Sequence, residues 1–281
     1  MEMKQVWLVT GANRGLGLAI AGAAQSAGHT VAASARDIST LQRIQRDGDP
    51  LCLAVELDVT SINSIRTAVR SVVETFGRID VLVNNAGYGQ LGAFEEISSE
   101  QIRSQFETNV FGLMEVTRAV LPTMRQQRSG KIFNVASAAG YKGGDRYGVY
   151  AASKFAVVGF SEALAAELAE FGIGVSVVAP GFFRTDFLDS TSVAHPQTTV
   201  DDYLKGSVAK RSLLESLNHQ QGGDPRLLGA SLVALANEDT APVHFPVGED
   251  AVAWVAERDA AVQRDIERFR ALSVNTKFVG V

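Results

Sequence analysis

The feature that most constrains this chain is a regular alternation of short apolar runs with longer stretches of helical spacing. The runs are continuously apolar and rich in β-branched residues, which is typical of strands that helices cover on both faces. We expect strands at residues 6–10, 30–35, 51–57, 79–84, 131–136 and 175–179, and helices at residues 15–27, 39–45, 61–76, 100–127 and 147–171. This order predicts a parallel, doubly wound α/β sheet with right-handed crossovers.

Composition and charge exclude several classes of protein. Apolar residues make up 46% and charged residues 20% of the chain, which excludes general disorder. The net charge of −5 argues against nucleic acid or an anionic membrane as a partner. No apolar run reaches the roughly 18 residues of a membrane span, and no signal peptide is evident. Cys52 is the only cysteine and the four histidines lack ligand spacing, so we expect no disulfide, no metal and a cytoplasmic location.

Two regions interrupt the alternation within what we expect to be a single domain, residues 1–281. Residues 185–224 are polar with dispersed aromatic and aliphatic side chains, which predicts an irregular insertion that acts as a substrate lid. A surface loop without a role is the alternative. Residues 249–272 carry apolar positions at helical spacing between charges, which predicts an amphipathic helix that docks on the core or on another subunit.

A glycine-rich turn follows the first expected strand and opens the first helix. Residues 10–17 read TGANRGLG, so the glycines recur as G-x-x-x-G-x-G. Glycine lets the backbone approach a pyrophosphate, and a helix N-terminus offers unpaired N–H donors with partial positive charge. An ordinary glycine turn is the alternative, but the position after a strand favours a dinucleotide. The candidate phosphate-binding residues are Gly11, Asn13, Arg14, Gly15, Leu16 and Gly17.

The end of the second expected strand bears on the choice of cofactor. An acidic residue near this point usually binds the adenosine ribose of a cofactor without a 2′-phosphate. Here Arg36 comes before Asp37, and Arg14 lies in the glycine turn. Because two guanidinium groups suit a 2′-phosphate through charge-assisted hydrogen bonds, we expect NADP(H). Solvated surface arginines are the alternative, and Asp37 keeps NAD open.

Three residues form a candidate catalytic group. Tyr150 and Lys154 are four positions apart at the start of an expected helix and therefore share a face. A nearby ammonium favours the phenolate, and lowering the phenol pKa by about 2–3 units requires roughly 3–4 kcal/mol. Ser137 follows a strand, at the end where open α/β sheets bind ligands, and its hydroxyl can hydrogen-bond a carbonyl oxygen. A plain helix pair and a capping serine are the alternatives.

Together these motifs resemble those of the short-chain dehydrogenase/reductase family. The family's order is kept by the glycine turn, LDV at 57–59, NNAG at 84–87, Asn109, Ser137, Tyr150 with Lys154, and PG at 180–181 with Thr185. The resemblance covers residues 1–190 closely and implies a Rossmann-type fold. Residues 85–89 and 180–186 are similar to a branch that holds hydroxysteroid and retinol dehydrogenase-like enzymes and bacterial reductases.

The resemblance implies a role for each matching residue. Tyr150 would be the general acid in reduction and the base in oxidation, and Ser137 would orient the carbonyl. Lys154 would bind the nicotinamide ribose and lower the phenol pKa, and Asn109 would hold a water of a proton relay. The cofactor-binding residues outside the glycine turn would be Arg36, Asp58 and Val59 at the adenosine, Asn85, Ala86 and Gly87 at its ribose, and Pro180, Gly181, Phe183 and Thr185 at the nicotinamide.

We therefore expect an NADP(H)-dependent oxidoreductase that interconverts a secondary alcohol and a ketone or aldehyde. The aromatic residues Tyr88, Tyr141, Phe182 and Phe187 suggest an apolar substrate pocket, although each ring alternatively packs in the core. One alternative is an NAD-dependent dehydrogenase of the same fold, and another is a cofactor-sensing protein without turnover. A sugar-nucleotide epimerase is disfavoured by the glycine spacing and the short tail.

The C-terminal part departs from the family's usual ending. Instead of a final strand and a Val-Asp-Gly-Gly turn, residues 242–248 read PVHFPVG and lead into the expected helix. This departure puts the family's common tetramer in doubt, because the tail forms one of its interfaces. A homodimer through residues 100–127 and 147–171 remains the expectation.

Overall fold

Seven parallel strands form the central sheet, in the order β3-β2-β1-β4-β6-β7-β9. The computed structural model describes residues 4–42, 44 and 52–278. The strands are β1 (Val6–Val9), β2 (Thr30–Ala35), β3 (Cys52–Glu56), β4 (Val81–Asn84), β6 (Gly130–Val135), β7 (Ile173–Pro180) and β9 (His244–Val247). The order reverses direction between β1 and β4, so the predicted doubly wound α/β fold is confirmed.

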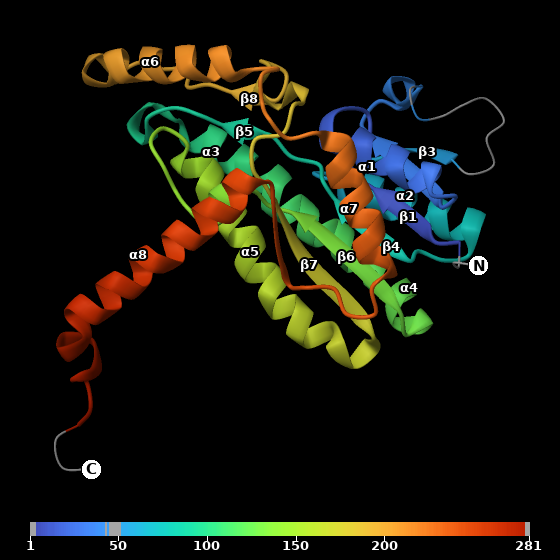
Figure 1. Cartoon of the computed structure of the whole chain (residues 1–281). Helices are drawn as coiled ribbons and strands as arrows, with labels where there is room; N and C mark the ends of the chain where they lie inside the picture. Colours follow the sequence, from blue (N-terminus) through green and yellow to red (C-terminus); the bar gives the residue numbers. More distant parts are fainter. Residues whose placement is uncertain (1–3, 43, 45–51, 279–281) are drawn as a thin grey trace.

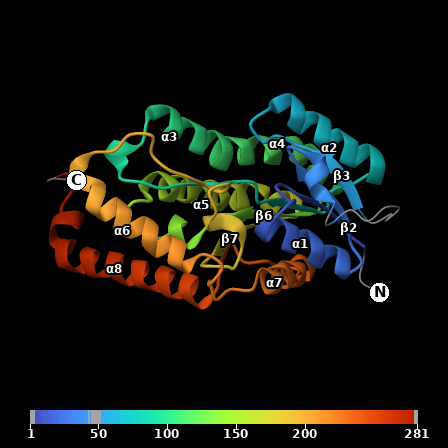
Figure 2. The same cartoon turned by 90° about the horizontal axis from the view of Figure 1, so that it is seen from above.

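Helices cover both faces of this sheet, as Figures 1 and 2 show. One face carries α1 (Gly15–Ser26) and α7 (Pro225–Asn237), and the other carries α2 (Ile62–Phe76), α4 (Leu113–Gln127) and α5 (Gly148–Leu168). In β1, Val6 and Leu8 pack in the cluster under α2, α4 and α5, whereas Trp7 and Val9 pack in the cluster under α1 and α7. Burial on both sides explains why the strand has no polar alternation.

The helix expected at residues 100–127 is divided in the structure. It consists of α3 (Ser99–Phe106), a π-helical segment (Glu107–Gly112) and α4. A π turn is a local change of hydrogen-bond pattern that apolar periodicity does not register, and such turns are frequent at functional sites. Asn109 lies within it.

Helix α5 was expected at residues 147–171 and packs on the sheet beside β7. Residues Gly148–Phe171 are long and apolar enough to cross a membrane by length and composition alone. Half of this apolar stretch is buried within the fold, which is how a core helix of a globular domain passes the same test.

Short elements complete the connections. They are the 3₁₀ turns Ile38–Leu41, Phe94–Glu96, Ala138–Gly140, Ala169–Phe171 and Asp186–Leu188, and the paired two-residue strands β5 (Gly89–Gln90) and β8 (Val193–Ala194). The helix expected at residues 39–45 is a 3₁₀ turn as far as it is described, since residues 43 and 45 lie outside the described residues. Residue 51 of the third expected strand lies outside them as well.

The region expected as an irregular lid, residues 185–224, contains regular secondary structure, so the expected irregularity was wrong. Its role as a substrate lid stays a prediction, and the region is called the lid below. It holds β8 and the 17-residue helix α6 (Asp201–Leu217). In Figure 1 α6 lies above the carboxyl ends of the sheet strands, away from the sheet itself. The N-terminal end of α6 is held by the buried Glu96, whose carboxylate accepts hydrogen bonds from Val200 N (3.1 Å) and Ser207 Oγ (3.2 Å).

The C-terminal part contains two elements that the sequence did not predict, α7 and the edge strand β9. Strand β9 pairs with β7, so a final strand is present despite the unusual sequence of residues 242–248. The helix expected at residues 249–272 is confirmed as α8 (Glu249–Val274). Its first turns contact the body through Ala251 and Val255, whereas Val262, Ile266 and Phe269 are exposed and the helix extends away from the sheet in Figure 1. A homodimer stays a prediction.

Leu8 and Leu272 make a matched test of where the core lies. Leu8 is fully buried in β1, and Leu272 on α8 is 76% exposed. We expect Leu8→Ala to lower the free energy of unfolding by about 2–5 kcal/mol, because it removes apolar burial and leaves a cavity. Leu272→Ala should change it by less than about 0.5 kcal/mol. Urea unfolding measures both; equal losses would contradict the assigned core.

Candidate active site

A cavity of about 690 Å³ lies at the carboxyl ends of the sheet strands. Its walls come from the loops that follow β1, β2, β3, β4, β6 and β7, from the lid, and from the start of α8. This is the crevice where the strand order reverses, the place where open α/β sheets bind ligands. Of the catalytic and cofactor-binding residues predicted from the sequence, all but Gly17 and Asn109 line it.

The glycine turn has the backbone that the sequence predicted. Gly11 and Gly15 have φ values of +63° and +55°, which other residues rarely adopt. Gly17 lies behind them, where an added Cβ would be 2.2 Å from the carbonyl oxygen of Gly11. Gly17 therefore allows α1 to approach the turn, which explains its place outside the cavity.

A hydrogen-bond network joins the turn after β1 to the loop after β4. The Thr10 hydroxyl oxygen accepts hydrogen bonds from the backbone N–H groups of Asn85 (2.9 Å) and Ala86 (3.0 Å). The Asn85 side-chain amide donates in return to the carbonyl oxygens of Thr10 (2.9 Å) and Gly11 (3.1 Å). These bonds fix the two loops on either side of the crevice in one geometry.

The residues at the start of α1 fit a dinucleotide phosphate. Among the described residues no side chain caps this helix N-terminus, and its first turn contains no acidic residue. The orphan N–H donors and the positive end of the helix dipole therefore face the cavity beside Gly11, Asn13 and Gly15. This combination binds phosphate in dinucleotide folds.

Ser137, Tyr150 and Lys154 lie together on one wall of the cavity. Tyr150 and Lys154 are presented by the first turns of α5, and the Lys154 Nζ is 5.8 Å from the centroid of the Tyr150 ring. The Lys154 ammonium donates a hydrogen bond to the Val135 carbonyl oxygen (2.8 Å), which ties α5 to the end of β6. Ser137 follows β6 and hydrogen-bonds the Tyr150 hydroxyl.

Burial dominates the ionisation of this group. Tyr150 is 9% exposed and Lys154 6% exposed. Burial raises the pKa of Tyr150 to about 12, although the hydrogen bond with Ser137 acts in the opposite direction. Burial also lowers the pKa of Lys154 to about 8. Among the protein's own groups the phenol is therefore less acidic than a free tyrosine, opposite to the direction expected from Lys154 as a neighbouring cation.

Asn109 is buried behind the cavity wall rather than in it. Its side-chain oxygen accepts a hydrogen bond from Tyr88 N (3.1 Å), and its amide donates to Tyr88 O (3.0 Å) and Ser153 Oγ (3.2 Å). The side chain thus fixes the backbone after β4 against α5. Gly87 fits between Asn109 and Lys154, since a Cβ there would lie 3.0 Å from Asn109 Oδ1.

The far end of the cavity is lined by residues after β2 and β3, including Arg36, Asp37 and Asp58. The Asp37 carboxylate accepts a hydrogen bond from Ser39 N (2.9 Å), and bonding to Ser39 lowers its pKa. Arg36 is exposed and takes part in no ion pair of the described residues. Arg14 points to the lid instead, and donates to the Thr191 carbonyl oxygen (2.8 Å).

The other end of the cavity is where sequence reasoning missed residues. Tyr88, Phe182 and Phe187 line it as predicted, whereas Tyr141 does not and instead hydrogen-bonds His244 Nδ1 (2.6 Å). The missed lining residues include Leu91, Tyr147, Leu188, Lys210, Leu214 and Trp254. They come from elements whose packing was not predicted, above all α6 and the start of α8; the aromatic and aliphatic residues noted in 185–224 were the only available signal.

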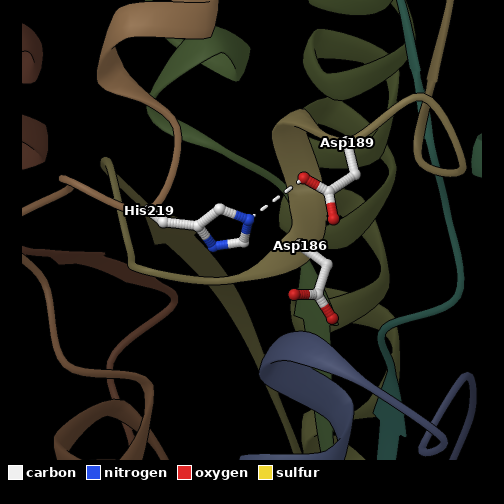
Figure 3. Close-up of side chains that lie close together, drawn as sticks. All are labelled: Asp186, Asp189 and His219. Carbon is white, nitrogen blue, oxygen red and sulfur yellow. Dashed lines mark ion pairs between the residues drawn. The ribbon is translucent and has the colours of Figure 1, made fainter.

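Figure 3 shows a cluster of Asp186, Asp189 and His219 at the base of the lid. Their possible ligand atoms lie within 4.8 Å of one another. His219 Nε2 is 3.3 Å from Asp189 Oδ1, and the Asn218 amide donates to the same oxygen (2.6 Å). Because Asp189 precedes β8 and His219 follows α6, we interpret the cluster as a tie between the two ends of the lid.

Comparison with known proteins agrees with this geometry. The short chain dehydrogenase family matches residues 5–195. The oxidoreductase BOA17 of Botryotinia fuckeliana is 39% identical over 276 residues, covering 97% of this chain and 99% of that protein. A short-chain dehydrogenase structure from Streptomyces avermitilis has a TM-score of 0.91 and 36% identity, covering 98% of this chain and all of that one. The chain belongs to the short-chain dehydrogenase/reductase family and is an oxidoreductase of that family.

A third comparison bears on the cofactor. The 3-ketoacyl-(acyl-carrier-protein) reductase of Brucella melitensis, solved in complex with NADH, has a TM-score of 0.73 and 26% identity. It covers 86% of this chain and 95% of its own. The fold of this chain is thus shared with a protein that binds a nicotinamide dinucleotide.

Gly17 and Gly22 offer a matched test of the phosphate cradle, since both lie in α1. Gly17→Ala would force the turn apart, whereas nothing lies within 4 Å of a Cβ at Gly22. We expect Gly17→Ala to raise the Kd for a nicotinamide dinucleotide, with NADPH and NADH both used as probes, about tenfold or more, a loss of ~1.4 kcal/mol. Gly22→Ala should bind as the wild type does. Fluorescence titration measures both, with thermal unfolding as the fold control; wild-type affinity in a folded Gly17→Ala protein would contradict the cradle.

Proposed function

We propose that this protein is an NADP(H)-dependent oxidoreductase that interconverts a secondary alcohol and a ketone or aldehyde. The observation that carries the proposal is the convergence of Ser137, Tyr150 and Lys154 on one wall of the cavity. A phenol proton donor, a hydroxyl partner and an ammonium group are what the polarisation and protonation of a carbonyl oxygen require. Family membership supports the same chemistry.

A bound nicotinamide would supply the hydride, and the chain would supply position and the proton. Pro180 ends β7, and Gly181, Phe183 and Thr185 follow it. All four line the cavity, where they would hold the nicotinamide. Ser137 would hydrogen-bond the carbonyl oxygen while Tyr150 donates its proton to that oxygen. Asn109 would act through the backbone of Tyr88 rather than by touching the substrate.

Because its pKa is about 12, Tyr150 carries its proton at neutral pH and can donate it in the direction of reduction. After the proton leaves, the phenolate is stabilised by the Ser137 hydrogen bond and by the nearby ammonium of Lys154, whose pKa of about 8 keeps it mainly charged at neutral pH. In oxidation the positive charge of the oxidised cofactor would add to this stabilisation. The same pair thus serves both directions.

The choice of NADP(H) rests on Arg36. Its guanidinium lines the adenosine end of the cavity without an ion-pair partner among the described residues, and is therefore available to a 2′-phosphate. Asp37, the residue that would favour NAD, is already hydrogen-bonded to Ser39. Arg14, expected to share this role, is engaged by Thr191. The NAD-dependent alternative draws support from the NADH complex of the Brucella melitensis reductase.

A cofactor-sensing protein without turnover is the alternative of another class. Such a protein needs the glycine cradle but no proton donor beside the nicotinamide position. The buried Tyr150 and Lys154 favour catalysis, because burying an ammonium and a phenol in a cavity wall costs stability, and groups with such perturbed ionisation cluster at catalytic sites.

Replacement of Tyr150 tests the proposed acid/base role. We expect Tyr150→Phe to lower kcat by about 10²–10⁴, because the proton donor is lost while the ring remains. The Kd for NADPH should stay within about threefold of the wild-type value. Tyr203→Phe, which removes a phenol on the lid helix outside the cavity wall, is the matched control and should retain activity. Ketone reduction by Tyr150→Phe at the wild-type rate would refute the role.

Replacement of Arg36 tests the proposed cofactor. Arg36→Ala should lower kcat/KM for NADPH about tenfold or more, since a charge-assisted hydrogen bond is worth ~1.5–3 kcal/mol, and should change kcat/KM for NADH little. Arg70→Ala, an exposed arginine on α2, removes the same charge elsewhere and is the control. A wild-type preference for NADH, or equal loss with both cofactors, would overturn the NADP(H) assignment.

A further inference from the structure

The lid helix α6 has one lysine on the face that meets the body. Its half-buried positions include Tyr203, Ser207, Lys210 and Leu214, which recur every three or four residues and so form one stripe. Leu204 and Lys205, by contrast, are exposed. The inward stripe of an amphipathic helix is normally apolar, and both Lys210 and Leu214 line the cavity. Lys210 therefore places a positive charge where packing alone would favour an apolar residue.

The position of Lys210 is fixed by contacts on the same stripe. Ser207, one turn earlier, donates a hydrogen bond to the buried Glu96 (3.2 Å) and accepts one from Arg146 Nε (3.3 Å). The Lys210 ammonium lies over the ring of Tyr147, 5.5 Å from its centroid. Tyr147 comes three residues before Tyr150, so this lysine is held above the start of α5 that presents the phenol.

Two other charged groups near this end of the cavity, Arg146 and Asp250, have partners. Arg146 pairs with Asp145, and the Asp250 carboxylate accepts hydrogen bonds from Phe182 N (2.6 Å) and Ala251 N (2.9 Å). Asp186 belongs to the cluster with Asp189 and His219. Among the ion pairs of the described residues none includes Lys210. A half-buried ammonium whose recorded contact is an aromatic face is ready to accept an anion.

We propose that Lys210 binds a carboxylate at the end of the substrate remote from the reacting carbonyl, so that the substrate class is an apolar keto acid or aldehyde acid. This inference rests on the proposed function. The wall between Lys210 and Tyr150 is apolar and aromatic, with Tyr147, Phe187 and Leu214 on the lining, which suits a hydrocarbon or aryl body. A single ammonium among such residues matches a carboxylate; phosphate sites more often add arginine or a helix N-terminus.

The test compares 4-benzoylbutyric acid and 5-benzoylvaleric acid with their methyl esters, which keep the aryl ketone and remove the charge. We expect the wild-type protein to prefer the acids, mainly through a lower KM. In Lys210→Met the acid-to-ester ratio of kcat/KM should fall about tenfold or more, as for the loss of a charge-assisted bond. Lys210→Arg should keep the preference, and Lys210→Glu should reverse it. Lys205→Met, on the exposed side of the same helix, is the matched control and should keep the wild-type ratio.

The outcomes separate this inference from the proposed function. Reduction of the esters with no preference for the acids, or a ratio that Lys210→Met leaves unchanged, overturns the carboxylate subsite and leaves the oxidoreductase intact. Failure of every compound with both NADPH and NADH counts against the proposed function as well. Circular dichroism and thermal unfolding of each variant establish that the fold is retained, so that a changed ratio reports on the site.

Discussion

The site depends on the link between Thr10 and Asn85 at the reversal of strand order. Parallel strands bring their carboxyl ends to one edge, but that edge is a crevice only because the loops after β1 and β4 turn apart. The Thr10 hydroxyl and the Asn85 amide hold those loops in register through four hydrogen bonds of 2.9–3.1 Å. Gly11 is thereby fixed with its positive φ, and the first turn of α1 meets the cavity without a side-chain cap from the described residues.

The chemistry depends on how burial acts on opposite charges. Enclosing a phenol and an ammonium favours the neutral form of each, so Tyr150 becomes less acidic and Lys154 more acidic. The pair alone does not make a phenolate. In the proposed function the cofactor therefore does more than carry the hydride. Its positive charge and the ammonium of Lys154 must together lower the pKa of the Tyr150 phenol towards neutral pH. The substrate end is built separately, by the lid.

Part of this organisation was predictable from the sequence and part was not. The apolar strands, the glycine turn and Ser137, Tyr150 and Lys154 each follow from local patterns. The structure brings the three catalytic candidates to the cavity wall, together with every phosphate-binding candidate of the turn except Gly17. The location of Lys210 was not predictable, because a lysine on α6 reaches the cavity only through the docking of Ser207 on Glu96, far apart in the chain.

The strand β9 was missed for a similar reason: its PVHFPVG sequence is weak by propensity, and pairing with β7 makes it a strand. Asn109 was identified by resemblance, but its contact with Tyr88 is a tertiary feature.

The titration of Tyr150 itself tests the central claim most directly. The phenolate absorbance of the wild-type protein minus that of Tyr150→Phe isolates this one group among the five tyrosines. Without cofactor the account predicts no Tyr150 phenolate until the pH approaches the pKa of about 12, and with saturating NADP⁺ it predicts a midpoint lower by two units or more, roughly 3 kcal/mol of added stabilisation. The same midpoint with and without NADP⁺ would contradict the account, because the phenol would then not sense the bound cofactor.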